Sequence, residues 1–190
     1  MDALQFFWLR RHNMPAAGAE LLDAPDAILR ARPHGLHSIA WLLWHVSRCE
    51  DVGVNRIVVD RCQVLDEGGW TDRLQVARRD IGTEMTDAEV AALSTTIDLS
   101  ALRAYWQAVT ERTTEVVRAL RPEDLDVPVS TEYLRRLVVE EGVITTTAGW
   151  VEKVWNQQPN RGWFLAQLAL THGWEHIASG RVVRELLNRI

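Results

Sequence analysis

Residues 39–46 form an eight-residue segment that is apolar at every position except His45. Ser38 precedes the segment and is a favourable N-cap residue for a helix. A helix that is apolar around most of its circumference has to be buried on most sides. We therefore expect a helix from Ile39 to about Cys62 that lies inside the fold.

Three further segments carry apolar residues at three- and four-residue spacing, which is typical of amphipathic helices. They cover residues 2–29, with an interruption at Pro15, residues 99–121, and residues 160–188, where Asn160 is the expected cap. Pro122 ends the third helix, because proline cannot continue a helix. Four long helices predict an all-α four-helix bundle, in one domain that spans residues 1–190.

Long irregular connections join these helices. Residues 66–97 contain one short helix, which Thr86 and Glu89 begin as a capping box. Residues 122–159 contain a second short helix at about 132–141. Residues 142–149 are the most strand-like segment, but they are few and we interpret them as a loop.

The net formal charge of -5 argues against a dedicated nucleic-acid-binding protein. The chain shows no charged-then-apolar leader and no apolar run of about 20 residues, so we expect no membrane span. Cys49 and Cys62 are expected on one helix about 20 Å apart, too far for a disulfide, which needs Cα atoms within about 7 Å. These features favour a reducing, cytoplasmic location.

His172 and His176 are four residues apart, so on a helix both rings lie on one face. Both belong to the apolar stripe of the fourth helix, and the pair alone is weak evidence of a metal site. His45 adds a third buried histidine from another helix. Three imidazoles that share one divalent ion and leave coordination positions open are typical of a catalytic site. The alternative is three hydrogen-bonded core histidines.

Other polar residues are weaker candidates, among them His12, His34 and His37, which are expected at the surface or in a loop. Cys49, one turn after His45, is a fourth ligand, a reactive thiol or, as we favour, a small core residue. Glu50 either binds an imidazole N–H or, as we favour, is a solvated helix charge. Most of the nine tryptophans are expected to fill the core, and a few to line a pocket.

Residues 37–51, HSIAWLLWHVSRCED, and residues 170–181, LTHGWEHIASGR, together resemble the DinB-like superfamily of metalloenzymes. The first matches a serine-led apolar helix with a ligand histidine and an acidic residue five positions later. The second matches a closing helix with two ligand histidines. Arg32-Pro33 and Trp70 also fit, and the resemblance covers nearly the whole chain.

The resemblance implies an up-down-down-up bundle and a metal, usually nickel or zinc, on His45, His172 and His176. It also implies homodimers and a small-molecule substrate. Some relatives use a low-molecular-weight thiol, namely mycothiol-dependent maleylpyruvate isomerase and the bacillithiol transferases. The function we expect is therefore a metal-dependent thiol S-transferase or isomerase. Cys49 and the tryptophan-rich segment 130–163 depart from the family pattern and leave the substrate open.

Two alternatives remain. One is a non-catalytic metal- or ligand-binding stress-response bundle, and the other is a metal-dependent hydrolase. The string His172-Gly-Trp-Glu175-His176 matches a metallopeptidase pattern with Glu175 as the general base. Such enzymes need a further acidic ligand well downstream, and Glu185 is the sole acid after His176, so we disfavour a peptidase.

Overall fold

The structure is a computed structural model that describes residues 1–158 and 160–189. Within this part every named element is helical, and the β pairing is limited to one isolated bridge between Pro128 and Asn160. The expected all-α class is therefore confirmed. None of the described helices combines the length and the apolarity needed to cross a membrane.

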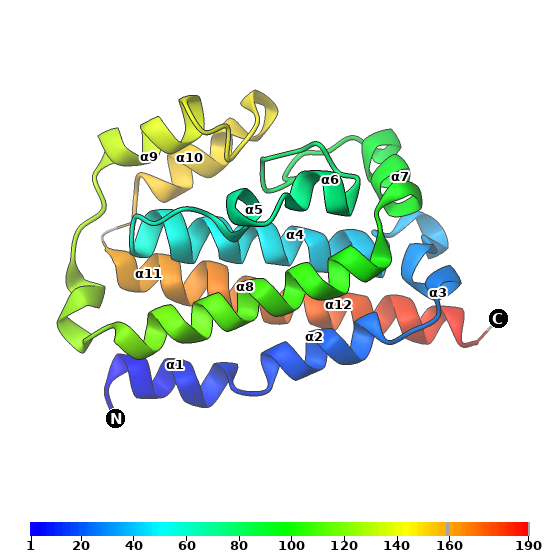
Figure 1. Cartoon of the computed structure of the whole chain (residues 1–190), viewed down its shortest axis with the longest axis horizontal. Coiled ribbons are helices and arrows are strands. Elements are labelled where there is room, and N and C mark those ends of the chain that lie inside the picture. Colours follow the sequence, from blue (N-terminus) through cyan, green and yellow to red (C-terminus); the bar gives the residue numbers. More distant parts are fainter. Residues whose placement is uncertain (159, 190) are drawn as a thin grey trace.

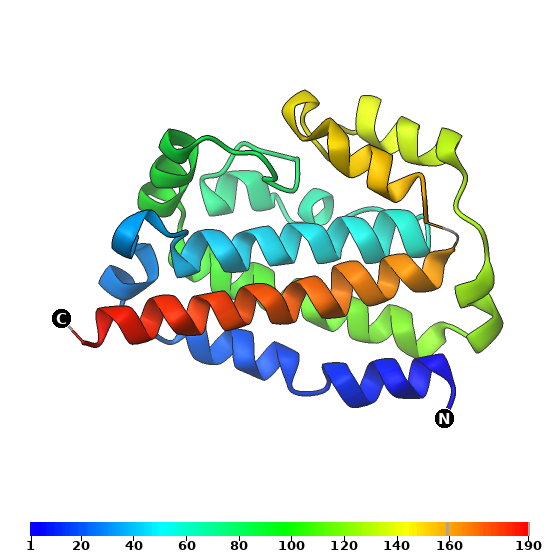
Figure 2. The same cartoon turned by 180° about the vertical axis from the view of Figure 1, so that it is seen from behind.

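Four long helical rods make up most of the molecule (Figure 1). In chain order they are α1 (Ala3–Arg11) with α2 (Met14–Leu22); α4 (Ile39–Asp51) with the π-helix η2 (Val52–Val58); α8 (Leu99–Ala119); and α11 (Arg161–Ala166) with the π-helix η5 (Gln167–Thr171) and α12 (His172–Leu187). In Figure 1, α1 and α2 run from left to right, α4 and α8 run back, and α12 returns to the right. Figure 2 shows α12 between α4 and α2, and it contacts both.

Short helices fill the connections between the rods. They are α3 (Asp26–Arg30), η1 (Pro33–Gly35), α5 (Val64–Glu67), α6 (Trp70–Leu74), α7 (Asp87–Thr96), η3 (Pro122–Asp126), α9 (Thr131–Val139), η4 (Thr146–Ala148) and α10 (Gly149–Trp155). The sequence predicts α7 and α9 but not α5, α6 or α10. In Figure 1, α9 and α10 lie beside each other at one end of the molecule, and α7 lies at the other.

The predicted helix caps are present. The side chain of Ser38 accepts the backbone N–H of Trp41 at 3.0 Å, and that of Asn160 accepts the N–H of Trp163 at 3.1 Å. Thr86 and Glu89 form the complete capping box. Local side-chain chemistry therefore determines where these helices begin.

The second rod ends earlier than predicted, at Val58 rather than near Cys62. Asp60 adopts a left-handed φ of 50°, and a residue there cannot continue a right-handed helix. Cys62 lies after this break and is exposed, whereas Cys49 is buried, and both are free. The premise that both cysteines lie on one helix was therefore wrong.

A buried polar network anchors the loop after η2 to α4. Asp51 accepts hydrogen bonds from the Tyr105 hydroxyl at 2.7 Å and from Arg48 at 3.1 Å. The same carboxylate accepts the backbone N–H groups of Val64 at 2.8 Å and Leu65 at 2.9 Å. Since Arg48 and Asp51 are fully buried, each depends on these partners to offset its lost hydration.

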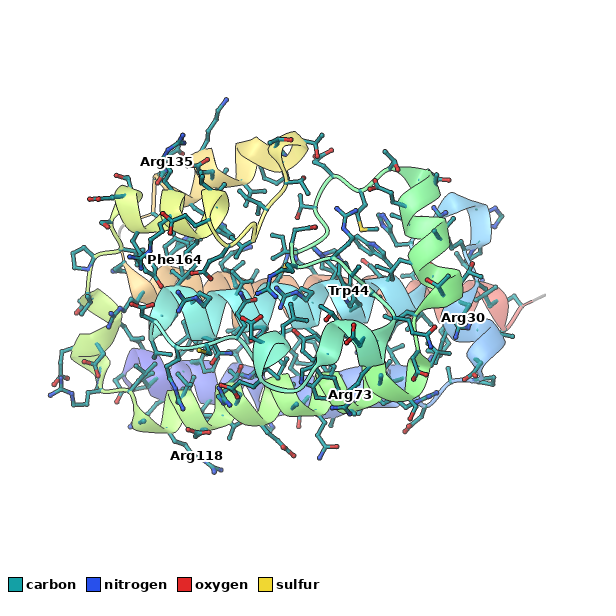
Figure 3. The ribbon with its side chains drawn as sticks, turned by 45° about the horizontal axis from the view of Figure 1, so that its top comes forward. Arg30, Trp44, Arg73, Arg118, Arg135 and Phe164 are labelled. Atoms are coloured by element: carbon teal, nitrogen blue, oxygen red, sulfur yellow. The ribbon has the colours of Figure 1, made fainter. Side chains whose placement is uncertain are left out.

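Apolar side chains fill the space between the rods, as the stick view shows for Trp44 and Phe164 (Figure 3). Both are fully buried, whereas Arg118 and Arg135 project from the surface. The π-helices η2 and η5 approach each other closely at Gly53. A Cβ atom at Gly53 would lie 2.6 Å from Cβ of Leu168, so this crossing requires glycine.

Candidate metal centre

The three predicted histidines meet between α4 and α12. One ring nitrogen from each of His45, His172 and His176 lies within 4.8 Å of the others. Nε2 of His45 and Nε2 of His172 are 2.9 Å apart. The ring centroids are separated by 4.4 to 5.0 Å, and all three pairs are edge-on. The sequence prediction that these rings converge is correct.

The ring of His45 is held on two sides. Its Nδ1–H donates to the backbone carbonyl of Ile81, and its face stacks on Trp41 at 4.8 Å and 15°. Because a carbonyl can only accept, the proton is on Nδ1 and the Nε2 lone pair faces the other histidines. Such a contact to the second ring nitrogen is typical of metal-ligating histidines.

The Ile81 carbonyl is the functional group that sequence reasoning missed. It is a backbone atom 36 residues from His45, so no pattern of side chains in the sequence indicates it. The Ile81 N–H donates to the Val143 carbonyl at 2.9 Å, which fixes the position of this loop. Gly82 follows with a φ of 82° and packs against Trp44, where a Cβ atom would approach the indole to 2.5 Å.

The environment keeps all three imidazoles neutral. Burial, together with the neighbouring histidines, lowers the pKa of His45 well below 6.5. Burial and then the charge of His176 lower the pKa of His172 to about 4, and burial and then His37 lower that of His176 to about 4. Neutral imidazole is the form that binds a metal, so the cluster is ready for a cation at neutral pH.

The donor set fits a divalent ion. Nδ1 of His176 is buried and has no hydrogen-bond partner, which is costly unless something else satisfies it. In the part of the chain that the structure describes, this trio is the one group of three or more His, Cys, Asp or Glu residues arranged to hold a metal. Imidazole nitrogens suit zinc and nickel, and three of them leave coordination positions open.

Comparison with known proteins agrees with this architecture. A family model of the DinB superfamily matches residues 10–179. The chain belongs to the DinB superfamily. A crystal structure of a conserved protein from Enterococcus faecalis superposes with a TM-score of 0.73 at 16% identity, covering 100% of this chain and 99% of the other. At this identity the likeness shows the fold alone. No curated protein matches the chain.

Cys49 is a core residue in this DinB superfamily member. Its Sγ lies 3.8 Å from Nε2 of His45, but it is not part of the ligand group. The thiol is 2% exposed, and burial raises its pKa to about 12. A thiol with such a pKa is protonated at neutral pH and therefore unreactive. The favoured interpretation of Cys49 as a small core side chain agrees with these observations.

Both interpretations of Glu50 were wrong. Glu50 is 1% exposed and forms an ion pair with Arg11, which is also 1% exposed. Arg11 donates in addition to the backbone carbonyl of Ala169 in η5. Arg11 lies on the first rod, 39 residues before Glu50, so the ion pair connects this rod to α4. Glu50 is thus neither solvated nor bonded to an imidazole.

The remaining acidic and histidine candidates lie outside the cluster. Glu175 is exposed, and its Oε2 lies 4.0 Å from Nδ1 of His172, beyond hydrogen-bond distance. Ser179, expected on the buried stripe, is exposed, and His12 is exposed as predicted. His37 stacks on the outer face of Trp41 at 4.1 Å and 16°.

Two cavities flank the histidine cluster of this DinB protein. One of about 230 Å³ reaches His172 and is walled by Trp150, Trp155 and Trp163. The other, of about 260 Å³, reaches His176 beside His37 and Val182. The expectation that a few tryptophans line a pocket is confirmed. The cluster can therefore be approached from two sides.

Proposed function

We propose that this DinB superfamily protein binds one divalent ion, nickel or zinc, on His45, His172 and His176 and is a metal-dependent enzyme. The observation that carries the proposal is the approach of three ring nitrogens from two helices to within 4.8 Å of one another. The Ile81 carbonyl supports it, because it directs the Nε2 lone pair of His45 toward the other two rings.

A divalent ion bound here acts as a Lewis acid and lowers the pKa of a thiol or water that reaches it. Three neutral imidazoles suit that role, since they add no negative charge to offset the cation. Trp41 stacks on His45 and excludes water from that face of the ring. Cys49 is buried and lies outside the ligand group, so we assign the reactive thiol to an external molecule.

The proposed reaction class is thiol S-transfer or isomerisation on a small molecule, with an external low-molecular-weight thiol. Membership of the DinB superfamily supports this class. We also propose an up-down-down-up four-helix bundle, which the rod directions in Figure 1 support. A cytoplasmic location, homodimers and the absence of a nucleic-acid or membrane partner stay predictions.

Elemental analysis of the purified protein tests metal binding. We expect about one equivalent of nickel or zinc in the wild type and almost none in His172→Ala, because two imidazoles hold an ion weakly. His172→Ala should also lower the melting temperature, since the bound ion stabilises the folded state. His12→Ala removes an exposed histidine and should keep its metal. Unchanged metal content in His172→Ala would contradict the assignment.

A turnover screen tests catalysis. The metal-loaded protein is incubated with a panel of thiols and electrophiles, and product formation is compared with that of His172→Ala. Thiol consumption that depends on His172 would support the transferase or isomerase. A stoichiometric ion without turnover would favour the non-catalytic binding bundle, and hydrolysis without thiol would favour the hydrolase.

A further inference from the structure

The cavity beside His172 is an aromatic chamber. α10 contributes Trp150 and Trp155, α11 contributes Trp163, and all three side chains line it. Trp155 is 3% exposed, whereas Trp150 is 52% exposed and lies at the rim. Nε1 of Trp150 donates to Glu84 at 2.9 Å, which fixes the rim to the loop that follows Ile81. The chamber is thus built from α10, α11 and the loop that contains Ile81 and Thr83.

The chamber reaches the histidine cluster directly. Its inner end is formed by His172, by Cys49, whose Sγ is 3.8 Å from His45 Nε2, and by Ile81, whose carbonyl binds His45. A molecule in the chamber would therefore lie next to the candidate metal position. The second cavity borders His176 instead, and no tryptophan is among the described residues that line it.

The lining carries no full charge. Among the described residues that border the chamber there is no aspartate, glutamate, lysine or arginine. A charged group placed among tryptophan and valine side chains would lose hydration without a compensating partner. The volume is about 230 Å³, and a cavity of about 150 Å³ is known to accept benzene. The space therefore suits one aromatic ring with a short substituent.

Gln167 places an amide in this lining. The His172 N–H donates to the Gln167 carbonyl across the π-turn, so the two residues are one turn apart. In an α-helix, residues five apart point in different directions, but in a π-turn they fall on nearly the same side. Both side chains consequently border the chamber. The Gln167 amide can both donate and accept a hydrogen bond.

We propose that this tryptophan-walled chamber binds the substrate of the histidine centre, and that the substrate is an uncharged molecule of about one aromatic ring with a hydrogen-bonding substituent that Gln167 contacts. The proposal rests on the proposed function for the identity of the reacting centre. The chamber itself would bind such a molecule whether or not an ion is present.

The test measures binding of benzyl alcohol, with benzoate as the charged probe of the same ring size, by titration calorimetry and tryptophan fluorescence. It uses the protein as purified and after removal of metal by chelation. We expect benzyl alcohol to bind both forms, and benzoate to bind the metal-free form about tenfold more weakly or not at all. Failure of benzyl alcohol to bind, or equal binding of benzoate to the metal-free form, overturns the proposal.

Matched valine variants locate the site. Val154→Trp fills the aromatic chamber, and Val182→Trp fills the second cavity. We expect the first to weaken benzyl alcohol binding at least about tenfold and the second to leave it within about twofold. Loss of binding only in Val182→Trp would place the ligand in the other cavity and overturn the proposal. Circular dichroism confirms that each variant is folded.

Gln167→Leu tests the hydrogen bond, with the exposed Gln157→Leu as its control. The ratio of benzyl alcohol to toluene affinity should fall about threefold to tenfold in Gln167→Leu and remain constant in Gln157→Leu. A constant ratio in both overturns the role of Gln167. Metal content is measured in the same samples. Wild-type protein without metal would contradict the proposed function, whereas the binding measurements would still test the chamber.

Discussion

His45 Nε2 lies 2.9 Å from His172 Nε2, although the two residues are 127 positions apart in the chain. Since Nδ1–H of His45 donates a hydrogen bond to the Ile81 carbonyl, Nε2 of His45 is the acceptor in this pair and His172 is the donor. A cation at this position would need the His172 proton to move to Nδ1. That atom faces Glu175 Oε2 at 4.0 Å, so a carboxylate is close to the new N–H.

The first prediction concerns the pH dependence of metal binding. Protons compete with a metal for imidazole lone pairs, and His172 and His176 have pKa values lowered to about 4. Affinity should therefore be nearly constant from pH 7 to 5, changing less than about twofold, and fall only as the pH drops through 4. If the three histidines had ordinary pKa values, the metal affinity would fall by more than about 10⁴-fold between pH 8 and 5. Nickel titrations at pH 7, 6 and 5 distinguish these outcomes, and a steep loss at pH 6 would show that the rings are not buried as described.

A second prediction concerns the two thiols. With a pKa of about 12, only about 10⁻⁴ of Cys49 is thiolate at pH 8, whereas Cys62 is exposed and accessible. Iodoacetamide should therefore add one label to the folded protein, at Cys62, and two after unfolding. Intact-mass and peptide analysis measures this. Two labels added at similar rates in the folded protein would exclude the core role of Cys49.

Cys49→Ala gives a third prediction. Because the ligand group consists of the three histidines alone, this variant should keep its full metal content. Elemental analysis of the variant beside the wild type measures it. A fall in stoichiometry without loss of folding, checked by circular dichroism, would restore Cys49 as a fourth ligand.

The buried pair of Glu50 and Arg11 gives a fourth prediction. Glu50→Ala leaves the Arg11 guanidinium buried without its anion, and removing one partner of a buried pair costs about 3–5 kcal/mol. Urea denaturation measures the loss. Glu115→Ala removes half of the exposed pair with Arg61 and should cost less than about 1 kcal/mol. Equal, small losses in both variants would show that Arg11 is not buried against Glu50.

Local features of the fold could be predicted from the sequence because their causes are local. Ser38, Thr86 and Asn160 each bond to a backbone N–H three residues ahead, so the residue types alone indicate the helix starts. The pairing of His172 and His176 on one face follows from their spacing. The convergence of His45 on them was inferred from its unusual place in an apolar helix.

Other features depend on contacts between distant segments. The early end of the second rod depends on the turn at Asp60, where Tyr133 from α9 and Arg56 bind the carboxylate. Burial of Glu50 depends on Arg11, and the orientation of His45 depends on a backbone carbonyl. Apart from Arg56, which is four residues before Asp60, these partners are distant in sequence, so residue spacing does not indicate them.

The most direct test of the histidine centre is anomalous diffraction from crystals of the protein grown after loading with nickel or zinc. We predict one anomalous peak between α4 and α12, about 2.0–2.1 Å from one ring nitrogen of each of His45, His172 and His176. No peak there, or a peak that contacts only His172 and His176 while His45 keeps its position, would contradict the account.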